Sequence, residues 1–259
     1  MHAPYIPISI TLLFLLFQQD VESFTITNIG RMMSHHHHRT PHTFLQMSSN
    51  DNQQPSSPQQ QQLLSPKALV NRGMNTFKQG NVAESIQYFD QAEGGGGMSS
   101  ITPFLWQRGI SYYYADKFQE GSKQFRIDVK VNPLDVEEIV WDIACLNRLS
   151  SDNTTPKDQM MSLPKGKTDR RKIMSTVYSL FRGDGATEHD LADAGHTGSQ
   201  SDEFYSLFYL GLYCESKGER SKAEQYMKAA KNSSYATGYG AADYMTDCAR
   251  VHCQLRGWM

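Results

Sequence analysis

Three side chains of metal-binding types are spaced as if they shared one face of a helix. His189, Asp193 and His196 fall at i, i+4 and i+7 of one segment, and imidazole and carboxylate groups are common zinc ligands. Gly195 interrupts this segment, however, and no fourth ligand is apparent. The acidic Glu188 beside it makes the stretch typical of a solvated helix face. We therefore predict no metal site here.

The other motifs that could carry chemistry are incomplete. The cysteines form no C-x-x-C pair and are too unevenly placed for a disulfide framework, which indicates reduced thiols packed in helices. They are Cys145, Cys214, Cys248 and Cys253. The run Gly94–Gly97 lacks the Lys-Ser or Lys-Thr of a phosphate loop, and no G-x-S-x-G element occurs. The sequence thus predicts a protein that is not an enzyme and has no cofactor or metal.

The bulk composition indicates one folded domain and gives no sign of nucleic-acid binding. The chain has 259 residues, 39% of them apolar. Roughly the first sixty residues differ in composition from the rest, which leaves room for one core. The 25 basic and 27 acidic residues give a formal net charge of −2, whereas phosphate binding usually requires a strongly basic balance. Nucleic acid is therefore not an expected partner.

The first 50 residues resemble a targeting sequence in two parts. Residues 8–17 (ISITLLFLLF) have the length of a signal-peptide core and are too short to span a bilayer. Residues 24–50 contain no Asp or Glu and are rich in Ser and Thr, as transit peptides are. The run His35–His38 is interpreted as low-complexity filler and not as a metal-binding tract. With Phe24 directly after the signal segment, the order resembles the bipartite presequences of algae with complex plastids.

That resemblance implies delivery to the plastid, and simple secretion is the alternative. It predicts a signal peptide over residues 1–23 and a transit-peptide-like segment over residues 24–50. Residues 51–62, rich in Gln, Pro and Ser, are expected to form a disordered linker. The folded domain is expected over residues 63–259, and no stable membrane span is expected in the mature chain.

A two-helix pattern recurs along this domain. Three segments align on a glycine in the first helix, and each then carries a turn residue, a small residue and a large apolar residue at the same offsets. The glycines are Gly73, Gly109 and Gly211, the turn residues Gly80, Asp116 and Gly218, the small residues Ser85, Gly121 and Ala223, and the large residues Phe89, Phe125 and Met227.

These residues resemble the tetratricopeptide repeat (TPR), a 34-residue unit of two antiparallel helices. In that family the glycine and the small residue let the helices approach closely, and the aromatic residue fills the gap toward the next hairpin. Pro133 would stop the second helix of the second copy. Gly211 follows Gly109 by 102 positions, which is three units of 34 and leaves room for two less regular copies.

The resemblance implies an all-α fold, a superhelix of helical hairpins or α-α solenoid. The first irregular copy would begin near Val136 without a recognisable second helix. The next would use Ile173–Phe181 and then Glu188–Ala194, after an irregular insertion at about residues 150–170. Tyr239–Leu255 would form the terminal cap that repeat arrays need.

By the family pattern, the first helices line a concave groove that binds a peptide or helix of another protein. Trp106 and Tyr113 are the preferred contacts, although such side chains would alternatively pack between hairpins. Members that grip a chaperone's C-terminal tail use Lys, Asn and Arg in the groove, and the corresponding positions here carry other residues, so that partner is not expected. The predicted groove positions are Val70, Met74, Phe77, Trp106, Ile110, Tyr113, Tyr114, Tyr205, Phe208 and Leu212.

The sequence therefore predicts a non-catalytic, protein-binding adaptor or assembly factor in the plastid, with a partner whose identity no repeat motif supplies. One alternative is a secreted or endomembrane-lumenal repeat protein, in which Asn153 and Asn232 would be glycosylation acceptors. A further alternative is an enzyme that uses the irregular region of residues 150–198.

Overall fold

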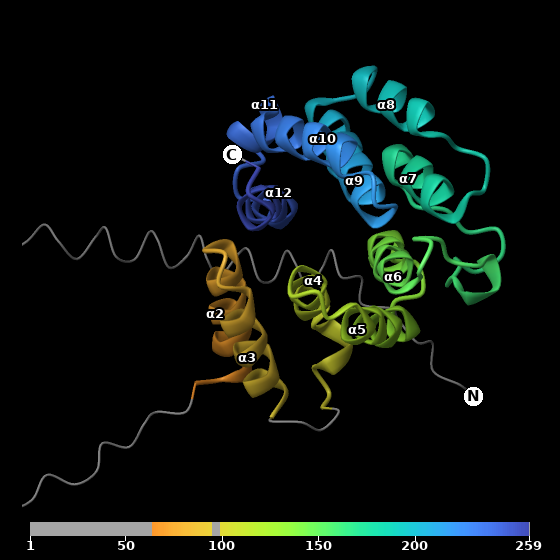
Figure 1. The fold of residues 1–259 in the computed structure, drawn as a ribbon. Helices are drawn as coiled ribbons and strands as arrows, with labels where there is room; N and C mark the ends of the chain where they lie inside the picture. Colours follow the sequence, from red (N-terminus) through yellow and green to blue (C-terminus); the bar gives the residue numbers. More distant parts are fainter. Residues whose placement is uncertain (1–63, 95–98, 259) are drawn as a thin grey trace, which may run out of the picture. The chain divides into compact units, whose positions relative to one another are not determined.

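The computed structural model describes residues 64–94 and 99–258, and this part of the chain is helical throughout (Figure 1). It contains eleven α-helices, two short 3-10 helices and no strand, which confirms the all-α prediction. The predicted signal peptide, transit-peptide-like segment and linker lie outside the described residues. No helix in the described ranges combines the length and apolar character that crossing a membrane requires. The helices are α2 (Pro66–Lys78), α3 (Val82–Glu93), η1 (Thr102–Phe104), α4 (Trp106–Tyr114), α5 (Phe118–Val131), α6 (Val136–Leu149), η2 (Lys157–Gln159), α7 (Lys172–Arg182), α8 (Glu188–His196), α9 (Gln200–Ser216), α10 (Arg220–Asn232), α11 (Ser234–Thr237) and α12 (Tyr244–Arg256).

Local signals in the sequence set the ends of several helices. Ser65 precedes α2, and its Oγ accepts a hydrogen bond from Ala68 N at 3.3 Å, which satisfies one free N–H of the first turn. Before α9, Ser199 and Asp202 bond each other reciprocally as a capping box. Gly183 follows α7 with φ of +62°, the left-handed conformation in which many helices end.

Three helix pairs share the packing that the aligned segments predict. The pairs are α2 with α3, α4 with α5, and α9 with α10. In each pair the first helix lies so close to the second that a Cβ on its glycine would overlap with a side chain opposite. The nearest distances from such a Cβ would be 2.9 Å for Gly73 and Phe89, 2.7 Å for Gly109 and Phe125, and 2.9 Å for Gly211 and Met227.

The aligned small residues leave room for neighbouring pairs. Ser85 is fully buried in α3, and its Oγ donates to Ser111 Oγ of α4 at 3.0 Å. A Cβ on Gly121 of α5 would lie 3.0 Å from Cys145 Sγ of α6. Ala223 of α10 is likewise fully buried. Ser85 thus lets the first pair approach α4 of the second, and Gly121 lets the second pair approach α6.

Between the second and the last pair the pattern is irregular. α5 ends at Val131, two residues before Pro133, and α6 follows and packs against α5 and, across the long loop, against α7. Residues 150–171 form a loop that contains only η2. This loop is fixed to α7, because Leu163 N donates to the hydroxyl of Tyr178 at 3.0 Å. α7 and α8 then occupy the segments where the second irregular copy was expected.

The C-terminal helix, α12, packs against helices of both the first and the last pair. α12 packs against α10, as a cap on the last pair would, and also against α2 (Figure 1). The ring of Tyr244 stacks on Phe77 of α2 with centroids 5.5 Å apart. His252 meets the ring of Tyr114 in α4 edge-on at 5.4 Å. α12 therefore covers the inner side of the first helices as well as the end of the array.

Candidate protein-binding face and the helix that covers it

The predicted groove residues fall into two groups that differ in exposure. Six of them are buried in the core, namely Phe77, Ile110, Tyr113, Tyr114, Phe208 and Leu212. The other four are half-buried and keep part of their surface in solvent, namely Val70, Met74, Trp106 and Tyr205. At these six positions the structure has a filled core in place of the open groove that was expected. Their role in partner binding stays a prediction.

The core contacts explain why these side chains are inaccessible. Tyr113 of α4 meets the indole of Trp141 in α6 at a centroid distance of 5.2 Å, and Phe208 of α9 meets the same indole from another direction at 6.1 Å. Tyr114 lies against His252 of α12. Helical periodicity gave these residues a common face, but helices distant in sequence pack onto that face and exclude solvent.

A buried polar network joins α12 to the same face. Glu215 of α9 is only 8% exposed. Its carboxylate accepts hydrogen bonds from Tyr113 Oη at 2.8 Å and from Arg256 Nε at 2.5 Å. His252 Nε2 lies 3.5 Å from Glu215 Oε1. The imidazole Nδ1 is 3.1 Å from the hydroxyl of Tyr114. The hydroxyl groups of Tyr113 and Tyr114, two of the predicted groove residues, are therefore directed to other residues of this chain.

The surroundings of Glu215 keep its carboxyl group ionised. Burial alone would raise its pKa, but the nearby His252 and the charge and hydrogen bond of Arg256 hold the pKa of Glu215 well below its ordinary value. Burial, reinforced by the charge of Glu215, raises the pKa of Tyr113 well above the ordinary value. The pair is thus a neutral phenol that donates to a carboxylate, which is a strong, charge-assisted hydrogen bond.

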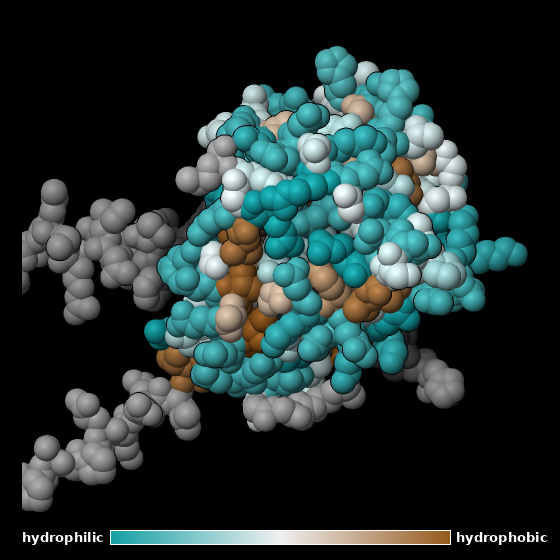
Figure 2. Space-filling model, viewed as in Figure 1, coloured by the Kyte–Doolittle hydropathy of each residue, from teal (hydrophilic) through white to brown (hydrophobic). Residues whose placement is uncertain are grey.

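The accessible part of the predicted face lies around the start of α12. Trp106 meets the ring of Tyr244 edge-on at 5.3 Å. The hydroxyl of Tyr205 donates to Asp243, the N-cap of α12, at 2.8 Å. Figure 2 shows apolar side chains in a stripe on the side of the unit where Figure 1 places α2, α4 and α12. We call the half-buried residues Val70, Met74, Trp106 and Tyr205 the exposed rim.

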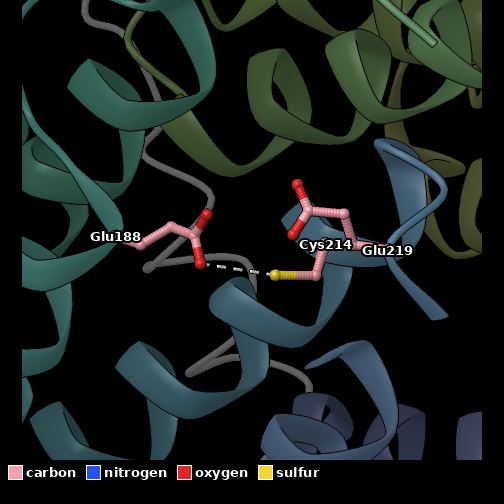
Figure 3. A group of neighbouring side chains, drawn as sticks. All are labelled: Glu188, Cys214 and Glu219. Atoms are coloured by element: carbon pink, nitrogen blue, oxygen red, sulfur yellow. Dashed lines mark hydrogen bonds between the residues drawn. The ribbon is translucent and has the colours of Figure 1, made fainter. Parts of the chain in front are cut away.

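A second cluster brings a thiol and two carboxylates together (Figure 3). Potential metal-ligand atoms of Glu188, Cys214 and Glu219 all lie within 4.8 Å of one another. The thiol of Cys214 donates to Glu188 Oε2 at 3.7 Å. Lys222 Nζ lies 3.3 Å from Glu188 Oε1 and 2.7 Å from Glu219 Oε2. The cluster already holds a counter-charge, so a metal ion would have to displace the ammonium group.

The thiol of Cys214 carries its proton in this cluster. Cys214 is fully buried, and burial together with the nearby charge of Glu188 raises the pKa of its thiol to about 12. Metal ions bind the thiolate form. The donor set fits a metal, which would have to displace both the thiol proton and Lys222. No spacing in the sequence indicates this cluster, because Glu188 starts α8, Cys214 lies in α9 and Glu219 precedes α10.

The segment with His189, Asp193 and His196 does not form a metal-ligand group among the described residues. His189 Nε2 lies 3.4 Å from Asp193 Oδ2, and both side chains are largely exposed. This geometry is an ordinary i,i+4 pair on a solvated helix surface.

No family model, curated protein or solved structure that was compared with this chain matches it.

Proposed function

We propose that the chain is a TPR-like helical repeat protein that binds a segment of another protein without catalysing a reaction. The observation that supports this is the shared register of three helix pairs. Each pair brings the glycine of its first helix against the large residue sixteen positions later. Each also turns through a residue with positive φ seven positions after that glycine. Stacked pairs of this kind commonly serve as binding surfaces for other proteins.

The exposed rim is the part of the first-helix face that a partner can reach directly. Met74 and Trp106 present apolar surface there, and the side-chain amide of Gln107 lies 3.9 Å from Met74 Sδ. Indole and thioether groups bury a large apolar area and adapt well to a partner. A protein segment with apolar side chains suits this surface better than a nucleic acid or a charged chaperone tail.

We further propose that the protein works in the plastid, on the basis of the composition of residues 1–50. If it instead entered the secretory pathway, its two Asn-x-Ser/Thr sites would be candidates for glycosylation. Asn232 is exposed at the end of α10, whereas Asn153 is half-buried in a loop with φ of +55°. A mature N-terminus near residue 50 and the absence of glycan at Asn232 are the results expected for plastid delivery.

The binding role can be tested by substitution on the rim. The full chain is used to capture partners from the organelle fraction, and each captured protein is then purified and titrated. We expect Trp106→Ala and Met74→Glu each to weaken binding about tenfold or more, since both remove apolar contact area. Phe104→Ala is the matched control, because Phe104 is an exposed aromatic residue in η1 outside the rim.

Circular dichroism would establish that each variant is folded. If folded Trp106→Ala and Met74→Glu bind every captured protein as tightly as Phe104→Ala does, the exposed rim is not the binding surface. If no captured protein binds the purified chain directly, the protein-binding function itself is wrong.

A further inference from the structure

α12 buries charged and polar side chains in the core. Nine of its thirteen residues are buried. Among them are Asp247 and His252, and Arg256 at its end is also largely covered. Removing such side chains from water costs free energy. α12 shares this property with α6, which buries Glu138 and Asp142, and differs from the Phe- and Leu-rich middle of α9.

Several polar atoms on α12 and directly after it are buried without a hydrogen bond. The hydroxyl of Tyr244 and the indole N–H of Trp258 have no hydrogen-bond partner, although each residue is only 3% exposed. His252 Nε2 faces Glu215 but makes no bond of good geometry. Each such atom lost its hydrogen bonds to water when the helix docked. These atoms would regain hydrogen bonds to water if α12 left, at the cost of exposing buried apolar side chains such as Val251.

The connection to α12 is a short segment with two glycines, and the hydroxyls of Tyr205 and Tyr235 hold its end by donating to Asp243. α11 ends at Thr237, and residues 238–243 join it to α12. This segment contains Gly238 and Gly240 and two alanines, and most of it is exposed, with Tyr239 at 71%. Glycine-rich connections of this kind change direction at little cost.

We propose that α12 is a resident occupant of the first-helix face, and that the partner is an amphipathic helix that replaces it there. This inference rests on the proposed protein-binding function and identifies the chemistry of the partner. Removal of α12 would uncover Phe77 and Tyr114, which its side chains now cover. These two of the six buried groove positions would then become part of a binding surface, whereas Tyr113 and Phe208 would stay covered by Trp141.

α12 itself indicates what the partner helix must carry. The face receives an aromatic ring at Tyr244, a small apolar side chain at Cys248 and a ring at His252, which are spaced four residues apart along one side of a helix. If α12 left, Glu215 of α9 would keep Arg148 of α6 at 3.8 Å but would lose its closest cation, Arg256, which donates to it at 2.5 Å. The expected partner helix is thus aromatic at its start and ends with Arg or Lys twelve residues later.

The first test measures whether α12 opens in the unmodified full chain. Amide hydrogen exchange is followed for residues 246–256 of α12 and for residues 208–216 of α9. We expect α12 to exchange at least about tenfold faster than α9, because it opens without global unfolding. Equal protection of the two helices overturns the proposal.

The second test uses a fluorescent peptide of residues 241–258 and measures its binding by anisotropy. The chain variant Arg256→Gln loosens the resident helix and removes the closest cation of Glu215, so we expect it to bind the peptide about tenfold more tightly than the unmodified chain does. A peptide that itself carries Arg256→Gln should lose this gain. Arg250→Gln is the matched control in the chain, since Arg250 lies on the exposed side of α12.

If Arg256→Gln does not fold, Lys78→Gln replaces it, because Lys78 Nζ pairs with Asp247 of α12 at 3.0 Å. A folded variant that binds the peptide no better than the unmodified chain overturns the proposal. A dimer of the unmodified chain would show that α12 of a second copy is the occupant and would overturn the choice of a foreign helix. If Trp106→Ala no longer binds its partners but α12 exchanges as slowly as α9, the proposed protein-binding function is supported and the displacement of α12 is wrong.

Discussion

Asp116 holds a backbone conformation that glycine adopts at the same place in the other two helix pairs. Its φ is +55°, against +83° at Gly80 and +78° at Gly218. A side chain in this region is strained, and aspartate tolerates it better than most residues. The carboxylate of Asp116 is mostly exposed and lies 3.7 Å from Arg256, so its ion pair contributes little. The positive φ of the turn therefore limits which residues position 116 tolerates, and the ion pair of its side chain does not.

The positive φ at Asp116 predicts how substitutions at this position change stability. Asp116→Gly should leave the free energy of unfolding unchanged or slightly higher, whereas Asp116→Val should lower it by about 1–2 kcal/mol. Urea denaturation of the two variants measures the difference. Asp193→Val is the control, since Asp193 is exposed within α8 and valine in a helix costs about 0.5 kcal/mol. Equal losses in Asp116→Val and Asp193→Val would contradict the argument.

A group of buried acids makes a second prediction at the residue scale. Burial raises the pKa of Asp128 to about 8, despite its hydrogen bond from Gln124. Burial and the charges of Asp135 and Asp128 raise the pKa of Glu138 well above its ordinary value. One carboxylate oxygen of each lacks a hydrogen-bond partner. Such an acid binds its proton more tightly when the chain is folded.

The sign of the pH dependence follows from these shifts. The stability contributed by an acid with a raised folded-state pKa is complete below its unfolded pKa and is lost as the pH rises through the folded value. The free energy of unfolding should therefore fall between about pH 5 and about pH 8. Glu215, whose pKa is lowered, contributes a constant amount across this window. Asp128→Asn should flatten the slope, as measured by urea denaturation at several pH values.

Asp152→Asn is the control for this experiment. Asp152 is exposed, and its hydrogen bonds with Ser150 and Thr154 lower its pKa to about 2. Asp152 gains its proton only below this pH range, so Asp152→Asn should leave the slope unchanged. An Asp128→Asn protein with the slope of the unmodified chain would show that Asp128 is ionised in the folded state.

At the scale of helices, the close approach within each pair sets the repeat. A Cβ on Gly109 would lie 2.7 Å from the ring of Phe125, which is fully buried. Arg108 adds a polar tie between pairs, since its guanidinium bonds Glu93 of α3 at 2.8 Å and Gln124 of α5 at 2.7 Å. Steric fit thus holds α4 against α5 within the second pair, and a partly buried ion pair from Arg108 to Glu93 joins the second pair to the first.

The steric fit can be measured in a double-mutant cycle. Gly109→Ala should lower the free energy of unfolding by about 1–3 kcal/mol, because the new methyl group has no space beside Phe125. Combined with Phe125→Leu, the cost should be smaller than the sum of the single costs by about 0.5 kcal/mol or more. Asn75→Ala, an exposed change on α2, is the control and should cost little. Additive single effects would mean that the two residues do not limit the approach.

At the scale of the whole molecule, all described core contacts lie within the unit that begins at Leu64. A chain that starts at residue 64 should therefore unfold at the same urea concentration as the full chain. The two midpoints are compared by circular dichroism at equal protein concentration. A clear decrease for the shorter chain would show that residues before Leu64 stabilise the fold. The result also tests the boundary at residue 63 that composition suggested.

The sequence by itself determined the helical class, the three helix pairs and their register. These features depend on contacts between residues that are close along the chain, such as Gly73 with Phe89, and on local caps such as Ser65. The fixed offsets between small and large side chains were therefore enough to predict the helix pairs and their register.

Only the tertiary structure decided which of these helix faces meets solvent. α12 reaches back to α2 and α4, and Arg256 pairs with Glu215 across 41 positions of sequence. Periodicity defines a face of a helix but does not specify what packs on it, because burial depends on the approach of distant segments. For that reason Tyr113 and Phe208, expected in an open groove, lie in the core, and the thiol–carboxylate cluster around Cys214 had no sequence signal.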